Sequence, residues 1–411
     1  MQIAALGFMI TPADSARAAA HVYSVSLLAC LPLAIAALGA LACRNASSQS
    51  RSLIWRSAIG ALLIIYVGRI LPMHWFAFSL PDDLAAPLVA LGRLQLSDAD
   101  LPNGIGQVAN FVPLLLAAYW IGVALLLLPV ARALISGSGA ARRARPLRDA
   151  TWDVLLDRAR AEIGVRQAVR LLVTDEAVAP QTWGLFRFAI LLPTAALEWS
   201  REQRHAVLLH ELTHVRRRDP FFLLAARVAC AFYWFHPGVW WASHHLANES
   251  EFACDDRVLE IGVRRSDYAE LLVLASGALL GHRPRHATAV SIVGRGGLRA
   301  RLIAITEPRQ ISRPATRAAA AVVMLFTLTT ALPVSVVQLA PSRRALTTLM
   351  TDARWESRAY AVAGLAQRRD SVEVARTAAR LDPSPRVRAW ARYALAQPSG
   401  RDLPAVLSKQ Q

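Results

Sequence analysis

Lysine is almost missing from this 411-residue sequence, which has one, Lys409, among 46 basic residues. Val406 stands three positions before it, so the sequence excludes a catalytic Ser-x-x-Lys pair. Cysteine is scarce too, and its four residues show no paired spacing, so they do not suggest a disulfide framework. Charged residues make up only 18% of the chain, whereas hydrophobic residues make up 55%. This balance is too apolar for an ordinary soluble domain and indicates a membrane protein.

Long apolar runs are what the sequence has instead. Four runs are long enough to cross a bilayer as helices: about Val22 to Cys43, Ile54 to Pro72, Val108 to Ile135 and Ala318 to Ala340. The first could be a signal peptide. It ends in Cys43-Arg44 rather than in a small-residue cleavage site, so we interpret it as a retained span.

Arginine in the loops predicts the orientation. Arg44 and Arg51 follow the first span, four aspartates against Arg93 follow the second, and five arginines follow the third. Basic loops stay cytoplasmic, so we expect the segment between the third and fourth spans in the cytoplasm and both termini outside. Basic flanks beside a lipid bilayer also explain the net charge of +17, and no nucleic-acid motif accompanies it. We therefore expect no direct nucleic-acid binding.

The stretch His210-Glu211-Leu212-Thr213-His214 places two imidazoles and a carboxylate on one helical turn. Residues four apart share a helix face, so His210 and His214 can bind one Zn²⁺ together. Glu211 then lies beside the open coordination position, where it can take a proton from water. The spacing predicts a zinc peptidase.

Catalytic zinc takes a third protein ligand, and Glu251 is the best candidate, on a helix expected from about Ser243 to Ile261. Asp255, one turn further on, is placed to accept a hydrogen bond from the second nitrogen of a ligand histidine. Glu249 is the rival ligand. It points about 200° away from Glu251 around a helix, so both cannot face the metal.

The segment 141–313 predicts a small mixed sheet beside the zinc helix. A helix from Thr151 to Ile163 precedes β-rich runs at Val169 to Thr174 and Phe188 to Leu192, and a capping box at Ser200 and Gln203 predicts that the zinc helix starts near Arg201. The second run, with Ile190 and Leu191, is a candidate edge that pairs with an extended substrate. A plain core strand is the alternative interpretation.

Three other features carry weaker hypotheses. The apolar stretch Phe221 to Trp241 is expected to form a helix and a turn that return to the same side, because a crossing would separate Glu251 from His210 and His214. His236, His244 and His245 could bind an oxyanion, or could be membrane-interface histidines beside tryptophans. Gly294 to Arg301 is suited to an exposed loop that the protein cleaves in itself.

These motifs resemble the BlaR/MecR family of membrane zinc peptidases. The resemblance covers roughly residues 1 to 340, and its strongest blocks are His210 to Asp219, Tyr233 to Pro237 and Glu251 to Asp256. It implies a gluzincin-like fold, zinc held by His210, His214 and Glu251, and Glu211 as general base. It also implies a bacterial inner-membrane protein in which an extracytoplasmic signal triggers self-cleavage and the loss of a transcriptional repressor.

The tail differs from the best-known family members, whose penicillin-binding sensor carries a serine with a lysine three residues later. Because that pair is missing here, a β-lactam signal is in doubt. Asp352, Arg358 and Leu365 recur instead as Asp382, Arg388 and Leu395, a period of about 30 that resembles HEAT-type helical repeats.

We therefore expect an α-helical multi-pass membrane protein with an α+β zinc peptidase domain and a helical repeat tail. The expected parts are a membrane region at 1–140, the peptidase at 141–313, a fourth span at 314–341 and the tail at 342–411. The function expected is zinc endopeptidase in signal transduction, acting on a protein or peptide substrate. A membrane quality-control protease and a non-enzymatic receptor or scaffold with a structural zinc are the alternatives.

Overall fold

A computed structural model describes residues 12–70, 76–80, 105–175, 179–281, 295–307, 314–335, 337–341, 343–366 and 372–396. The chain divides into two compact units. The metal-site unit comprises Pro32–Leu62 and Gly122–Thr329, and the tail unit comprises Met1–Leu31, Leu63–Ile121 and Thr330–Gln411. The unit boundaries fall inside the long apolar helices, so the domain boundaries expected at 140 and 313 stay predictions.

Three helices have the length and apolar composition of membrane spans. They are α1 (Pro12–Ala42), α2 (Ser48–Ile70) and α4 (Ile105–Arg143), with span-like windows at His21–Ala42, Ser48–Arg69 and Leu114–Ile135. The window of α4 leaves large side chains such as Leu115, Trp120 and Leu125 exposed, as expected of a surface that faces lipid. The first three predicted spans are therefore confirmed as helices long enough to cross a bilayer.

The fourth predicted span differs from expectation at its end. Helix α11 (Pro314–Ser335) ends at Ser335, and Val337–Pro341 form strand β6, which pairs in parallel with β1 (Phe76–Leu80). The apolar stretch of α11, Arg317–Ala331, is shorter than the other three windows. It packs closely on α1, because a Cβ on Gly39 would lie 2.5 Å from Cγ1 of Val323. A fourth crossing stays a prediction.

A four-stranded mixed sheet lies in the metal-site unit in the order β2-β3-β5-β4. Its strands are β2 (Arg145–Pro146), β3 (Val169–Thr174), β4 (Gln181–Trp183) and β5 (Phe188–Pro193). β5 pairs in parallel with β3 and antiparallel with β4. A short 3₁₀ helix, η1 (Thr194–Glu198), follows it.

The sheet order overturns one prediction. Ile190 and Leu191 lie in the interior strand β5 and are 0% and 2% exposed, so they cannot form the substrate edge. Their continuous apolar run is typical of a strand that is covered on both faces. Among the described residues, the strand with only one paired side next to β5 is β4, which makes Gln181–Trp183 the edge.

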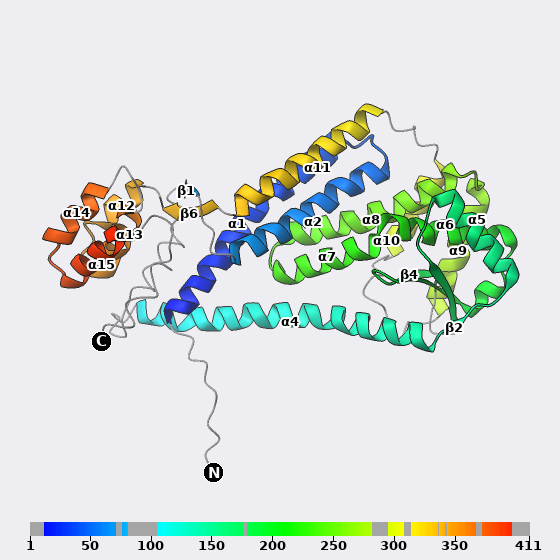
Figure 1. The fold of residues 1–411 in the computed structure, drawn as a ribbon, viewed down its shortest axis with the longest axis horizontal. Helices are drawn as coiled ribbons and strands as arrows, with labels where there is room; N and C mark the ends of the chain where they lie inside the picture. Colours follow the sequence, from blue (N-terminus) through cyan, green and yellow to red (C-terminus); the bar gives the residue numbers. More distant parts are fainter. Residues whose placement is uncertain are drawn as a thin grey trace, which may run out of the picture. The chain divides into compact units, whose positions relative to one another are not determined.

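Helix α6 (Arg201–Arg217) carries the His-Glu motif, and α5 (Ala150–Ile163) lies beside it (Figure 1). The capping box predicted at Ser200 and Gln203 is confirmed. Every residue from Ala206 to Val215 is buried. The apolar members pack with Trp152, Ile190 and other buried side chains in one core. A helix buried on all sides holds its polar side chains rigidly, which a metal site requires.

Helices α7 (Asp219–Phe232) and α8 (Pro237–Glu260) form an antiparallel hairpin through a turn at Tyr233–His236, which confirms the predicted helix and turn. The hairpin packs on α2, where the Tyr233 hydroxyl donates to the Leu62 carbonyl at 2.9 Å. Trp55 of α2 also stacks on His245 at 5.0 Å between ring centroids. The apolar helix α2 and the α7–α8 hairpin thus share one packed unit.

Helices α9 (Arg265–Gly281) and α10 (Arg295–Thr306) complete the unit. The exposed loop expected at Gly294 to Arg301 is wrong for residues 295–301, which are helical, and Arg301 is only 8% exposed. Gly294 lies outside the described residues. Arg301 is held there by the carboxylates of Glu251 and Asp255 on α8, a long-range interaction that local glycine content could not indicate.

The tail unit ends in α12 (Arg343–Leu349), α13 (Trp355–Ala366), α14 (Val372–Leu381) and α15 (Pro385–Ala396). Its sequence repeat is also a structural repeat. Arg358 Nη1 donates to the Asp352 carbonyl at 2.8 Å, and Arg388 Nη1 donates to the Asp382 carbonyl at 2.7 Å. Arg358 also bridges the copies through a salt bridge with Asp382 at 2.9 Å. The assignment to the HEAT class stays a prediction.

Gly184 follows edge strand β4 and has a φ of +101°, and a Cβ there would lie 2.2 Å from the carbonyl oxygen of Arg187. Gly262 has a similar φ of +106° with nothing near its Cβ position. Gly262→Ala should cost only the backbone strain, on the order of 1–2 kcal/mol, whereas Gly184→Ala adds the clash. Thermal melting of the purified protein should therefore show a larger loss for Gly184→Ala. Equal melting temperatures for both variants would contradict the turn geometry.

Candidate metal centre

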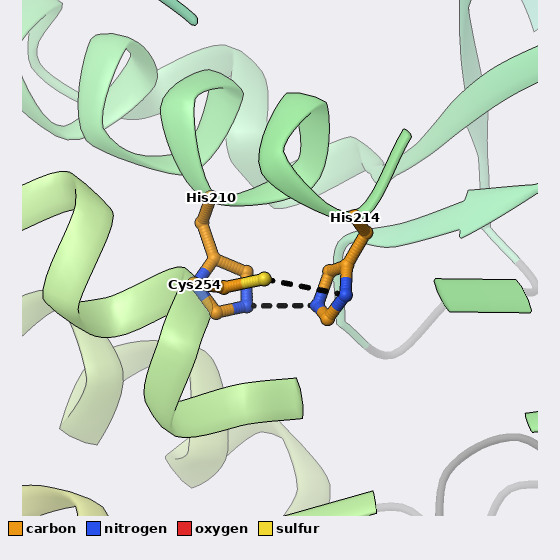
Figure 2. A group of neighbouring side chains, drawn as sticks. All are labelled: His210, His214 and Cys254. Carbon is orange, nitrogen blue, oxygen red and sulfur yellow. Dashed lines mark hydrogen bonds between the residues drawn. The ribbon is translucent and has the colours of Figure 1, made fainter. Parts of the chain in front are cut away.

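His210 and His214 point their rings toward each other from one face of α6 (Figure 2). Their Nε2 atoms are 3.2 Å apart. Two nitrogens bound tetrahedrally at about 2.0–2.1 Å from one zinc ion lie roughly 3.3 Å apart. The two imidazoles therefore have the spacing of ligands to a common ion.

Glu251 of α8 completes the triangle. Its Oε2 lies 3.6 Å from His210 Nε2, and its Oε1 lies 3.5 Å from His214 Nε2. The rival, Glu249, faces the other way and forms two hydrogen bonds with Arg51 of α2 at 2.8 and 2.9 Å. The structure thus brings Glu251, and not Glu249, to the two histidines.

The Nδ1 atoms of His210 and His214 lie next to buried carboxylates. His210 Nδ1 lies 3.3 Å from Asp255 Oδ1 and 2.9 Å from the Tyr268 hydroxyl, which itself donates to Asp255 at 2.7 Å. His214 Nδ1 lies 2.8 Å from Asp219 Oδ2. An Nδ1–H that donates to a carboxylate leaves the Nε2 lone pair available for a metal. Asp255 therefore lies where the sequence predicted it.

Asp219 was missed as a site residue, although it stands five positions after His214. It reaches back because Arg218, between α6 and α7, adopts a left-handed conformation with φ 55°. Arg218 is the one non-glycine residue with a positive φ among those the structure describes. Such a conformation in a long side chain is strained and favours a functional reason for the turn.

Arginines neutralise the buried carboxylates. Arg301 forms a bidentate contact with Asp255 at 2.6 and 2.8 Å and reaches Glu251 at 2.9 Å. Arg56 of α2 pairs with Asp219, and its Nη1 donates to the Arg217 carbonyl at 2.9 Å. Burying ions is favourable only when they are paired and hydrogen-bonded. The apolar helix α2 thus contacts the carboxylate that orients His214.

The electrostatics favour a cation between the rings. Burial alone would lower the pKa of His210, but hydrogen bonds with Asp255 and Glu251 outweigh it and raise that pKa to about 10. Burial opposes ionisation of Glu251, yet Arg301 and the two histidines lower its pKa to about 2. Asp255 is ionised for the same reason, because Arg301 outweighs burial and lowers its pKa. A divalent ion would take the place of the imidazolium charge.

Cys254 is the competing donor, since its sulfur and the two histidines could together hold a metal ion (Figure 2). The sulfur lies 3.4 Å from Nδ1 of His214, the nitrogen that already meets Asp219. Burial raises the pKa of the Cys254 thiol well above its usual value, so it resists forming the thiolate that zinc needs. The carboxylate set of His210, His214 and Glu251 fits zinc better.

Glu211 lies 6% exposed next to edge strand β4. The Thr182 hydroxyl lies 2.8 Å from Glu211 Oε2 and 2.9 Å from the Glu211 carbonyl oxygen. The edge strand is therefore tied to the carboxylate that the sequence singled out as a base. Two of the three histidines considered for oxyanion binding have partners of another kind: His245 stacks on Trp55, and His244 contacts Asn248 at 2.9 Å. These contacts favour the interface interpretation over oxyanion binding.

Replacing Glu251 by alanine should lower zinc affinity at least about 100-fold, because a direct ligand should matter more than outer partners, whose loss costs 10- to 100-fold. Glu249→Ala is the matched control, two residues away on the same helix, and should leave zinc affinity unchanged. Competition with a chromophoric chelator on the purified full chain measures both. Zinc loss in Glu249→Ala alone would reverse the ligand assignment.

The sequence matches one family of known proteins. Residues 92–305, a little more than half of the chain, match the family described as BlaR1 peptidase M56. The regulatory protein BlaR1 of Bacillus licheniformis is 36% identical over 102 residues, which cover 24% of this chain and 16% of BlaR1. The methicillin resistance mecR1 protein of Staphylococcus aureus is 32% identical over 83 residues, or 20% of this chain and 14% of mecR1.

The aligned part thus spans less than a fifth of the length of either relative. The family match is broader. It begins at residue 92, before α4 in the sequence, includes all of α6 and α8, and ends at residue 305 in α10, after Arg301. It contains His210, Glu211, His214, Glu251 and Asp255 together. On this ground the chain belongs to the BlaR1 peptidase M56 family.

Proposed function

We propose that this protein is a membrane-embedded zinc endopeptidase that works in signal transduction. The observation that carries the proposal is the convergence of two Nε2 atoms and the Glu251 carboxylate, 3.2 to 3.6 Å apart. His210, His214 and Glu251 would hold the ion. Zinc bound there supplies a Lewis acid that polarises a peptide carbonyl and makes water more acidic.

Other residues of the chain have the remaining roles in the reaction. Asp255 and Asp219 hold the two imidazoles by Nδ1, so that both Nε2 atoms point at one place. Glu211 takes the proton from the attacking water and can return it to the leaving amine. Thr182 holds the carboxylate of Glu211 at 2.8 Å. Burial of the α6 motif excludes bulk water from this proton transfer.

Edge strand β4 is the place for a substrate in this proposal. One side of β4 pairs with β5, and an extended peptide could pair with its other side. The Thr182 contact places such a peptide beside Glu211. β4 therefore takes the role that the sequence assigned to Ile190 and Leu191.

The biological setting follows the relatives. We propose that the peptidase faces the cytoplasm of a bacterial cell and that both termini are extracytoplasmic, since the arginine-rich loops favour this orientation. An extracytoplasmic signal would lead to cleavage of the protein itself or to loss of a transcriptional repressor. The helical repeat, which follows α11, would receive that signal.

A scaffold with a structural zinc would need a fourth protein ligand, because structural sites are closed. Among the described residues, the one extra sulfur beside the histidines is that of Cys254, and it faces His214 Nδ1 rather than the Nε2 side. This favours a site with a position left for water, and so favours the enzyme.

Glu211→Gln preserves the shape of the side chain but removes the base. The variant should keep zinc at the wild-type level and lose cleavage by at least about 100-fold, the lower range for a general base. Membranes that contain the wild type or the variant can be compared by mass spectrometry of cleaved fragments, with zinc content measured in parallel. Cleavage at the wild-type rate in Glu211→Gln would refute the mechanism.

A further inference from the structure

A cavity of about 460 Å³ lies beside the candidate centre in the metal-site unit. Edge strand β4 and the turn after it form one wall, α7 and α8 form another, and the end of membrane helix α4 forms the third. Thr182, which contacts Glu211, lines it. The cavity therefore opens next to the base and not at a remote surface. Its volume is within the range of ligand pockets.

The lining is apolar and its few charges have one sign. Leu134, Leu185 and Leu223 contribute side chains, and both charged residues of the lining, Arg187 and Arg227, are arginines. No carboxylate occurs among the lining residues. Phe186 in the turn after β4 also lines the cavity and is 90% exposed. A large aromatic side chain left exposed beside an apolar cavity is typical of a binding surface.

Two rows of residues connect the cavity to the metal site. Ser243 and Ala247 line the cavity on α8, and Glu251 follows in the same four-residue steps, so all three share one helix face. On the opposite wall, Thr182 joins the cavity to Glu211. A peptide whose backbone pairs with β4 would place one side chain in the cavity while its next peptide bond lies near Glu211.

We propose that this cavity is the specificity pocket of the peptidase and that it takes a bulky, uncharged apolar side chain of a polypeptide. The proposal rests on the proposed function. The occupant is a segment at the membrane boundary, because Val130, Ala133 and Leu134 belong to the apolar window of α4. A lipid chain would also suit an apolar cavity. The polypeptide is favoured because the lining includes residues of β4, whose pairing among the described strands is with β5 alone, and because one of them, Thr182, contacts the base.

Ala247 gives the sharpest test, because a phenyl ring there would fill the cavity from the α8 wall. Ala161 on α5 is exposed and lies outside the lining, so Ala161→Phe is the matched control. Leu223→Ala is the second variant, which enlarges the pocket, in case Ala247→Phe does not fold. Thermal melting and zinc content check that each variant is intact.

Binding is measured on the full chain carrying Glu211→Gln, so that no peptide is consumed. The probes are fluorescent Gly/Ser/Thr peptides with one guest residue, leucine, phenylalanine, tryptophan or aspartate, placed in turn at each position. Fluorescence anisotropy should show leucine or phenylalanine peptides binding about 10- to 100-fold more tightly than aspartate peptides, the gain expected from burying one such side chain. Ala247→Phe should remove this preference, Leu223→Ala should shift it toward tryptophan, and Ala161→Phe should leave it intact.

The results separate the two proposals. An unchanged preference in both pocket variants overturns the pocket, and so does equal binding of all guests, which is the result expected if lipid fills the cavity. If the preference follows the variants but the wild-type protein cleaves none of the peptides, the pocket stands and the proposed function fails. If the wild type cleaves them without regard to the guest, the peptidase stands and the pocket fails.

Discussion

Two imidazole nitrogens and one carboxylate meet at a single point, and the rest of the metal-site unit is arranged around that meeting. Bringing a histidine pair and Glu251 within 3.6 Å buries several charged groups. Such burial is tolerable only with compensating charges and hydrogen bonds. Asp255 with Arg301 compensates behind His210, and Asp219 with Arg56 compensates behind His214. The two sides of the site have the same arrangement: the imidazole ring contacts a carboxylate, and that carboxylate contacts an arginine.

The arginines of α2 make this apolar helix part of the arrangement. Arg56 reaches Asp219 beside His214, and Arg51 holds Glu249 two residues before Glu251. Arg56 also donates to the carbonyl of Arg217 at the end of α6, so one apolar helix contacts both helices that carry the candidate ligands. A shift of α2 relative to α6 and α8 would have to break or move these buried contacts. α2 is therefore physically connected to the candidate metal site.

Local patterns predicted the parts of the site that depend on helix periodicity. The four-residue spacing of His210 and His214, the capping box at Ser200 and the opposed directions of Glu249 and Glu251 all follow from one helix geometry. The predictions that failed concern contacts between residues that are far apart in the sequence. An apolar run fits an edge or an interior strand equally well, so Ile190 was misplaced, and nothing near Arg301 in sequence indicates the carboxylates that bury it. Asp219 reaches His214 through the left-handed turn at Arg218. A bulky residue in the sequence gives no sign of such a turn.

X-ray absorption at the zinc edge of the purified full chain tests the central claim most directly. The account predicts one zinc ion with two imidazole nitrogens and carboxylate or water oxygens at about 2.0–2.2 Å, and no sulfur. A zinc–sulfur distance of about 2.3 Å would instead assign Cys254 as a ligand. That result, or active protein without bound metal, would contradict the account.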